Sequence, residues 1–559
     1  MNVKTSIEDT GQGLTIRSGN RYLYSRYQPE KRPNLLATHA PLEHRCIYYI
    51  PSPLFGYGLR ALAERIPEDS IILAIEISEK MMALCSRHIP NDIIEHPRLI
   101  LACLSDRQAL HALFYQLGPW KYRRIRRLDL NGGTELNPEI YNQLSDFLLE
   151  DLSTYWRNRL ATGRLGRQWI RHIYANLAAM EKGGIDFRSF QHYHIAGIPV
   201  VVGAGPSLEK SLEFLRKWRS HLWILATDTA VSALSDACIR PDAISILETQ
   251  SWNMLDLHGM KLTEIPLIAD ISAYPPSLEQ TGGVCYTVSS SFAELEFLKR
   301  IADTELAPFP IPPLGSVGLA SVEIALNLRS DHLPLLLTGL DFAYQPGKSH
   351  SRGSSSHRWQ LAAIDRLNPQ PGWEACMNRP RLYRSDARGK KLNTDSVLDG
   401  YASLFKDRYA DLGRLFVLAP AGLDLGVPII SLEDAERLLI ETPDIPNPVN
   451  TTPHHSQFSP VDYRGGASQF LDDEENRLKQ IIESWDEYMI HGNNESALME
   501  SLSRMDQIYL DFPDEPPLPK NEHSFLVRAA DRSRRLRRYI KRTRQVSTSL
   551  VRSTDRNAD

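Results

Sequence analysis

Between about residues 190 and 435 the chain alternates short apolar runs with helical patterns. The apolar runs lie at 194–202, 223–227, 243–247, 266–269, 284–288 and 333–338. Continuous apolar runs of this kind are typical of strands that are buried on both faces of a parallel sheet. Apolar residues recur every three or four positions in the helix that starts at Leu208. The pattern predicts an α/β domain with a doubly wound, mostly parallel sheet.

A smaller unit of the same kind precedes this domain, behind a short β lead-in at 3–28. Apolar runs at 46–50 and 71–75 predict two strands, a helical pattern covers 59–66, and the second strand ends at Glu76. Strand, glycine turn, helix, strand and acid is the order of a nucleotide-binding unit. The turn holds Gly56 and Gly58 but no third glycine, so a structural unit without a ligand is the favoured interpretation.

Helical patterns fill much of the remainder, at 139–160, 165–180 and 467–510. A basic helix is expected at 528–544, either as a solvated face or as a surface for an acidic partner or membrane. Prolines among polar residues at 443–460 predict an extended linker. The predicted organisation is an N-terminal α/β (Rossmann-like) domain at 1–131, a helical connector at 132–190, a central α/β domain at 191–440, a Pro-rich linker at 441–466 and a helical C-terminal region at 467–559.

Composition narrows the class of protein. A chain of 559 residues is too long for one hydrophobic core. The 64 basic and 68 acidic residues give a net charge of -4, which argues against a nucleic-acid coat protein. None of the six cysteines forms a C-x-x-C pair, so neither a thiolate zinc site nor a disulfide framework is expected. Without an apolar leader or an apolar run of about 18 residues, the sequence predicts a cytoplasmic protein with no membrane segment.

Small and acidic residues gather where the predicted strands of the central domain end. Ligands of open α/β sheets bind outside these carboxyl ends, so the convergence predicts a site. The candidate nucleotide-binding residues are Gly203, Gly205, Pro206, Ser207, Thr227, Asp228, Glu248, Gly315, Ser316, Val317 and Gly339.

The loop from Gly203 to Ser207 is the main element of this predicted site. Its glycines allow a close approach of the backbone to a ligand, and the helix that follows offers free N–H groups to a phosphate. The spacing matches neither the dinucleotide motif nor a P-loop, which favours a mononucleotide; a purely structural turn is the alternative. Asp228 stands where a polar group meets a ribose, although an N-cap would have the same spacing.

A polar Gly/Ser loop follows the last buried strand and has the character of a lid. It starts after Asp341 and contains His350, whose ordinary pKa suits a general base. Asp341 and His350 are the candidate catalytic residues. The sequence has no Asp-x-Asp pair for a sugar nucleotide, so the chemistry is expected to need no metal or other cofactor.

Three separated motifs, in the same order, resemble those of the motility accessory factor (Maf) glycosyltransferases. They are Val201–Leu208, Gly315–Val317, and Thr338–Phe342 with His350 downstream. The central domain is also similar to archaeal 6-hydroxymethylpterin diphosphokinase and to a family of bacterial sialyltransferases. The resemblance extends over about residues 45–435.

The resemblance implies that a nonulosonic acid (a pseudaminic, legionaminic or sialic-type sugar) is moved from its CMP form to Ser/Thr hydroxyls of flagellin, for flagellar assembly and motility. The loops at Gly203 and Gly315 would bind CMP, and His350 would act as the base. The 419–423 stretch lacks the Asn and paired glycines of many members, and Glu248 replaces a common Asp, which leaves the sugar open. Tyr401 is a further family-like feature, or a core residue.

Two other functions stay open at this point. One is a pterin diphosphokinase that uses ATP and Mg²⁺, and the other is a non-catalytic factor that binds flagellin during assembly. No nucleic acid is expected as a partner, and the oligomeric state is not predicted.

Overall fold

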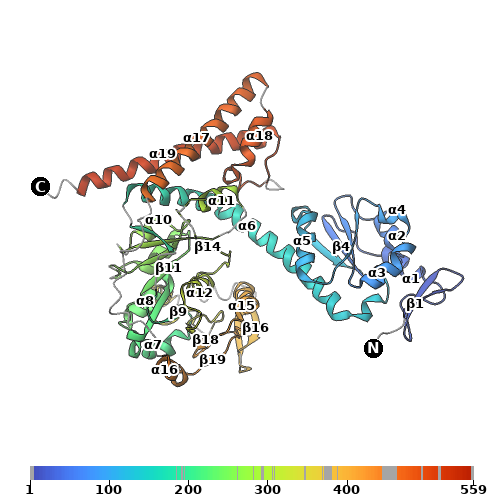
Figure 1. Ribbon diagram of the computed structural model, residues 1–559, viewed down its shortest axis with the longest axis horizontal. Coiled ribbons are helices and arrows are strands. Elements are labelled where there is room, and N and C mark those ends of the chain that lie inside the picture. The colour runs from blue at the N-terminus through green and yellow to red at the C-terminus, as the bar shows by residue number, and fades with distance from the viewer. Residues whose placement is uncertain are drawn as a thin grey trace. The chain divides into compact units, whose positions relative to one another are not determined.

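The computed structural model describes residues 5–554, except 184–185, 191–192, 194, 261, 263, 281–282, 291–294, 305, 307–308, 345–347, 368, 370–380, 387, 443–462, 493–494 and 514–517. Most of the predicted Pro-rich linker therefore lies outside the described residues. The chain forms two compact units (Figure 1), one from Met1–Arg164 with Asp511–Leu518 and one from Leu165–Leu510 with Pro519–Asp559.

The first unit is built on a parallel four-stranded sheet. Its strands run in the order β6 (Leu99–Cys103), β5 (Ile71–Glu76), β4 (Cys46–Pro51) and β7 (Arg124–Arg127). The predicted strands at 46–50 and 71–75 are β4 and β5. A small antiparallel sheet of β1 (Thr5–Asp9), β2 (Leu14–Ser18) and β3 (Arg21–Tyr22) forms the β lead-in. The helices α1 (Lys31–Thr38), α2 (Leu59–Ala63), α3 (Glu79–Cys85), α4 (Asn91–Ile94) and α5 (Arg107–Leu117) complete the unit.

A parallel sheet forms the centre of the second unit, and the predicted doubly wound α/β class is confirmed. Its strand order is β14 (Pro310–Ile311), β13 (Cys285–Ser290), β12 (Leu267–Asp270), β11 (Ala243–Ile246), β10 (Leu222–Thr227), β9 (Ile198–Val202), β15 (Leu335–Thr338), β18 (Leu415–Leu418) and β19 (Ile429–Ile430), with β8 (Phe187–Ser189) beside β13. The helices around it are α7 (Leu208–Lys217), α8 (Asp228–Asp236), α9 (Met254–Leu257), α10 (Pro275–Leu278), α11 (Glu296–Ala302), α12 (Val317–Leu328), α13 (Ser355–Ala362), α15 (Ser396–Tyr409) and α16 (Leu432–Glu441).

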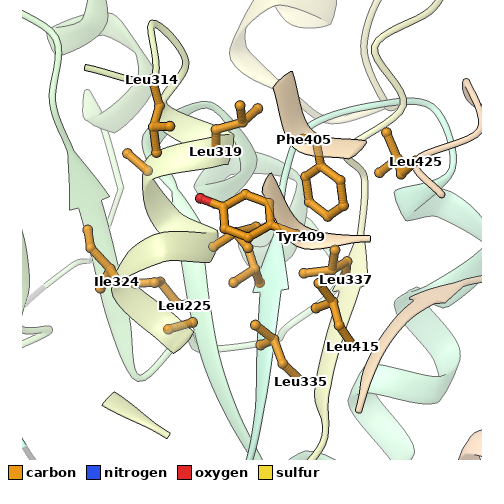
Figure 2. Packing of buried hydrophobic residues seen from close by; sticks show 14 of the residues in the cluster. Leu225, Leu314, Leu319, Ile324, Leu335, Leu337, Phe405, Tyr409, Leu415 and Leu425 are labelled. Carbon is orange, nitrogen blue, oxygen red and sulfur yellow. The ribbon is translucent and has the colours of Figure 1, made fainter. Parts of the chain in front are cut away.

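The core on one face of this sheet is packed between strands and two helices (Figure 2). Leucines of β10, β15 and β18 meet side chains of α12 and α15, and all of those shown here are almost fully buried. The labelled residues of this layer are Leu225, Leu319, Ile324, Leu335, Leu337, Phe405, Tyr409 and Leu415. Tyr409 satisfies its hydroxyl by donating to Glu323 of α12 at 2.7 Å. Burial of the strands on both faces explains why they read as unbroken apolar runs.

Helix α6 (Pro138–Lys182) is a single helix of 45 residues, where the sequence predicts two. The expected break lies near Gly163, but a side chain there would meet nothing within 4 Å and the backbone stays helical. A glycine inside a helix costs only about 1 kcal/mol relative to alanine. Apolar residues on both sides, such as Leu148 and Ile173, are fully buried, and that packing outweighs the glycine.

The C-terminal helices are α17 (Tyr463–His491), α18 (Glu495–Ser503) and α19 (His523–Thr554). The predicted basic helix lies within α19, and much of its charge is paired inside the chain. Arg537 and Lys541 both reach Glu475 of α17 at 3.2 and 3.1 Å, and Arg544 bonds Glu181 of α6 at 2.9 Å. The arrangement gives the basic residues an internal structural role. Within the described residues, no helix combines the length and the apolar character needed to cross a bilayer.

A buried polar network joins these helices to α6 and α11. The carboxylate of Glu474, which is 1% exposed, accepts hydrogen bonds from Tyr174 at 2.9 Å, Arg300 at 2.8 Å and Gln507 at 2.8 Å. The charge of Arg300 compensates the buried carboxylate. Such a network is stabilising only while every member keeps its partner.

Replacing Arg300 by alanine is expected to destabilise the second unit by about 3 kcal/mol, because the buried carboxylate of Glu474 then keeps only Arg477, at 3.8 Å, as a counter-charge. Lys479→Ala is the matched control, since Lys479 lies on α17 and pairs with Glu483 at 3.5 Å while both side chains are more than half exposed. That pair is worth about 0.3–0.5 kcal/mol. Urea unfolding followed by circular dichroism measures the free energy of unfolding of both variants. Equal losses of stability in the two variants would contradict the role of the network.

Candidate functional site

The strand order of the large sheet reverses at one point, between β9 and β15. From β9 the chain runs outward through β10, β11, β12 and β13, and it then returns to place β15 on the other side of β9. The loops that leave neighbouring strands at such a switch point diverge to opposite faces, which opens a crevice at the carboxyl ends. The Gly203–Ser207 loop leaves β9 at this point, and Gly339–Asp341 leaves β15.

Hydrogen bonds join these two loops tightly. The N–H of Gly203 donates to the carbonyl of Thr338 at 2.9 Å, and the N–H of Gly205 donates to the carbonyl of Gly339 at 2.8 Å. The N–H of Gly339 in turn donates to the hydroxyl of Ser207 at 3.1 Å. The structure therefore brings together four of the predicted site residues, with Pro206 buried between them.

Asp341 holds the same loop from the other side. Its side chain is 5% exposed and accepts a hydrogen bond from the N–H of Ser207 at 2.7 Å. Burial raises the pKa of this carboxyl, and the bonds from Ser207 oppose the rise. The sequence predicts a catalytic role for Asp341, which stays a prediction; the bond from Ser207 shows that its carboxylate also holds the start of α7.

The loop glycines allow two backbones to pack against each other. A Cβ on Gly205 would lie 2.6 Å from the carboxylate of Asp341, and one on Gly203 would lie 2.6 Å from Cδ2 of Leu340. The same Cδ2 lies 2.7 Å from where a Cβ of Gly318 would be. Leu340 therefore occupies the space between two glycines of separate motifs, and it brings the start of α12 to the switch point.

These contacts change the expected role of the loop in anion binding. The sequence predicts free N–H groups for a phosphate, but those of Gly203, Gly205 and Ser207 are bonded to β15 and its loop. The N–H of Leu208 is also bonded, to Gly205 at 3.1 Å. The hydroxyl of Ser207 accepts from Gly339 and is turned inward. The loop thus shapes the crevice, while most of its own donors are satisfied within the fold.

The second predicted loop, Gly315 to Val317, opens α12. Ser316 is the N-cap residue but makes no side-chain cap bond, and Val317 is the first helical residue. The carbonyl of Gly315 accepts a hydrogen bond from the hydroxyl of Tyr401, which also packs on Phe342. Tyr401 thus fastens this loop to α15, close to the end of β15.

Acidic residues follow the next two strands. Thr227 ends β10 as the N-cap residue of α8, and Asp228 is the first residue of the helix. The buried Asp228 side chain accepts hydrogen bonds from the N–H of Thr229 at 2.8 Å and the amide of Asn253 at 3.1 Å. Burial, with the nearby charges of Asp256 and Glu248, raises the pKa of Asp228 to about 7. Burial also raises the pKa of Glu248 and of Asp256.

These acids need hydrogen-bond donors or protons to be stable there. Asp256 is bonded to the hydroxyl of Ser355 at the start of α13. Among the described residues, no three His, Cys, Asp or Glu side chains are grouped as metal ligands.

The Asp228→Asn variant tests the raised pKa through stability. An acid whose pKa is higher in the folded protein weakens the fold as it ionises, so that stability falls as the pH rises from about 4 to above 7. The amide of the variant cannot ionise, so the variant does not lose this stability as the pH rises. We expect its stability relative to wild type to improve by on the order of 2 kcal/mol between pH 5 and pH 8. Melting curves at both pH values measure this difference, and Asp236→Asn, at the exposed end of the same helix, is the matched control variant.

The His350 loop crosses the same edge of the sheet. The N–H of Ser351 donates to the carbonyl of Ala204 at 2.8 Å, and the carbonyl of Gly353 accepts from Ser232 of α8 at 2.6 Å. Nδ1 of His350 lies 3.0 Å from the hydroxyl of Ser349. Burial lowers the pKa of the half-buried His350, which keeps its ring neutral at physiological pH. Among the described residues, His350 forms no hydrogen bond with Asp341 or Asp228.

Helix α6 contributes three polar residues that are not among the predicted site residues. Gln168, His172 and Asn176 are spaced by four, so they share one helix face. Gln168 and His172 bond Thr249 after β11 at 2.8 and 2.7 Å, and the buried Asn176 donates to Ile271 after β12 at 2.8 Å. Burial lowers the pKa of His172 to about 4. The i, i+4, i+8 polar spacing is the signal that could have identified them.

The N-terminal glycine turn has a structural explanation. A Cβ on Gly58 would lie 2.7 Å from the carbonyl of Pro33, so the glycine allows α1 to pack closely. Glu76 is buried and accepts from Ser52 and Tyr141, both at 3.0 Å. Gly58 and Glu76 thus both have structural contacts within the unit.

Comparisons with known proteins agree with this architecture. A family model described as "6-hydroxymethylpterin diphosphokinase MptE-like" matches residues 171–347. An uncharacterized protein of Treponema pallidum (strain Nichols) is 25% identical over 532 residues, covering 93% of this chain and 92% of that protein. The solved structure of the MAf glycosyltransferase from Magnetospirillum magneticum AMB-1 is similar with a TM-score of 0.53 at 14% identity, over 100% of this chain and 93% of the other. The chain therefore has a Maf-like fold with an MptE-like domain, as its motifs predict.

Proposed function

We propose that this chain, which shares the fold of a Maf glycosyltransferase over its whole length, is a glycosyltransferase that uses a CMP-linked nonulosonic acid as donor and a Ser/Thr hydroxyl of flagellin as acceptor. The observation that carries the proposal is the junction of three motif loops at the β9/β15 switch point. The Gly203, Gly315 and Gly339 loops meet around Leu340, and the His350 loop is bonded to Ala204.

The donor would lie in this crevice, with the ribose or base toward Asp228 and Glu248. Both acids have raised pKa values because they are buried, and both would gain from donors on a ligand. Asp341 would keep the Gly203–Ser207 loop in place. The proposed reaction uses no metal ion, because the sequence has no Asp-x-Asp pair of the kind that chelates a cation beside a sugar nucleotide.

His350 would act as the general base. Its neutral ring would take the proton of the acceptor hydroxyl while that oxygen bonds to the anomeric carbon. The bond from the anomeric carbon to the phosphate oxygen breaks, and CMP leaves with the electron pair. The Gly/Ser loop that carries His350 would close over the donor and limit its hydrolysis.

A nucleotide screen by melting temperature tests the proposal. CMP and a CMP-linked nonulosonic acid are expected to raise the melting temperature of the full chain, since a ligand at 100 times its Kd adds about 2.7 kcal/mol. Sugar transfer to purified flagellin, followed by mass spectrometry, is the second measurement. If neither stabilisation nor transfer is observed, the proposal is overturned and a non-catalytic assembly factor is favoured.

The MptE-like match over residues 171–347 favours one alternative, a diphosphokinase that transfers a diphosphate from ATP to a pterin. The same screen separates it from the first proposal. Stabilisation by ATP with Mg²⁺ and not by CMP would support the diphosphokinase, and stabilisation by CMP alone would support the glycosyltransferase.

A further inference from the structure

A cavity of 380 Å³ lies beyond the carboxyl end of β18, and four cationic side chains line it. Lys210 comes from the first turn of α7. Arg388, Lys390 and Lys391 come from the hairpin of β16 (Arg381–Ser385) and β17 (Lys391–Asp395). Elements far apart in the sequence thus direct positive charge to one cavity, which a solvated charge run on a single element would not do.

The cavity keeps a net positive charge, because its four cations outnumber its two acids, Asp386 and Asp424. Within the described part of the chain, none of the four cations forms an ion pair. Asp386 accepts the backbone N–H groups of Arg388 and Lys390 at 2.9 and 2.8 Å, which shapes the hairpin turn. Asp424 accepts the N–H of Gly426 at 3.0 Å and pairs with Lys406 at 3.8 Å. Both acids therefore have partners of their own.

Much of the remaining lining is apolar. Leu423, Leu425 and Val427 are buried there, with Leu392, Val417 and Ile429 beside them. Apolar walls lower the local dielectric and strengthen the attraction between the cations and an anion. The volume lies within the range of about 300–1,000 Å³ that small-molecule sites occupy.

The cavity adjoins the candidate site directly. Lys210 follows Ser207 by three residues and interacts electrostatically with Asp341. Gly422, in the cavity wall, packs so closely on the backbone of Asp341 that a Cβ would overlap it, and the N–H of Leu423 donates to the carbonyl of Asp341 at 2.8 Å. Most N–H groups of the Gly203–Ser207 loop are already bonded, so an anion near this edge would meet the four cationic side chains instead.

We propose that this cavity binds the phosphate of a small phosphorylated molecule, with the guanidinium of Arg388 as a bidentate donor and the three lysines as point charges. The inference rests on the cavity itself and not on the proposed reaction. Two sources supply this chemistry: the donor nucleotide of the proposed function, or a separate phosphorylated metabolite.

Isothermal titration of the full chain with inorganic pyrophosphate and with CMP tests the proposal. We expect Lys390→Ala/Lys391→Ala to weaken pyrophosphate binding at least about tenfold, because two of the four charges are lost. Lys210→Ala, on another element, should weaken it as well. Both lysines of the hairpin are exposed, so their removal should leave the melting temperature unchanged.

The control variant is Lys31→Ala/Arg32→Ala, which removes equal charge from another cavity, in the first unit. Unchanged pyrophosphate affinity in that control, with loss in the hairpin variant, supports the site. No pyrophosphate binding by wild type, or an equal loss in the control, overturns it. If CMP displaces pyrophosphate, the donor is the occupant; if CMP does not bind while pyrophosphate does, the site stands and the donor proposal fails.

Discussion

Replacement of His350 by alanine is expected to reduce sugar transfer at least 100-fold while the affinity for CMP stays within about twofold. A positioned general base contributes about 10²–10⁴-fold to a rate. The imidazole ring of His350 contacts the hydroxyl of Ser349, so its removal is not expected to disturb the Gly203–Ser207 loop. Transfer is measured by mass spectrometry of flagellin, and affinity by titration with CMP.

The matched control is His332→Ala. His332 is exposed and precedes β15, whereas His350 follows it, so the two histidines lie beyond opposite ends of one strand. The control should transfer at the wild-type rate. Full transfer by the His350 variant would exclude this residue as the base, whatever the outcome for nucleotide binding.

The pH profile adds a second readout for His350. A base works only when it is unprotonated, and burial holds the pKa of His350 below its ordinary 6.5. The rate should therefore stay constant from pH 8 down to about 6.5 and fall only under more acidic conditions. A decline that starts well above pH 6.5 would point to another group.

Replacement of Gly339 by alanine is expected to destabilise the second unit by about 2–5 kcal/mol and to abolish CMP binding. Gly339 has a φ of +71°, where an L-residue costs about 1–2 kcal/mol. Its Cβ would also overlap the carbonyl of Gly203, and this would force the loops of β9 and β15 apart. Overpacking of this kind adds about 1–3 kcal/mol.

Gly259→Ala separates these two causes. Gly259 has a φ of +77°, but a Cβ there would meet nothing within 4 Å. This control carries the backbone cost alone and should retain CMP binding. The difference between the two melting temperatures measures the close approach of the two loops, and equal melting temperatures would mean that the loops can separate without loss.

Much of the fold could be predicted from the sequence because the central strands are buried on both faces. The apolar runs at 223–227 and 243–247 match β10 and β11 almost residue for residue. The hairpin of β16 and β17 was not predicted. Its strands carry Arg384 and Lys391 on exposed positions and lack the apolar alternation that identifies a strand.

The candidate site could be predicted only in part. Strand ends are readable, so Gly203, Gly339 and Asp341 could be placed at one edge of the sheet. The sequence does not show which strands are neighbours in the sheet. This strand order brings Gly203 next to Thr338, 135 residues later, so that the two form a hydrogen bond. That pairing alone satisfies the N–H groups of the loop. An anion at this edge therefore needs cationic side chains nearby. The donor, the acceptor and the role of His350 remain predictions.

The discontinuity of the first unit affects how the protein folds as it is synthesised. Arg159 donates to the carbonyl of Phe512 at 2.5 Å, and the unit includes Asp511–Leu518, so its last part follows Arg164 by 347 residues (511 minus 164). At about 5–20 residues per second, that interval takes on the order of 20–70 seconds of translation. The N-terminal unit of the nascent chain therefore stays incomplete during this time. A prematurely terminated chain would lack the segment that completes the unit.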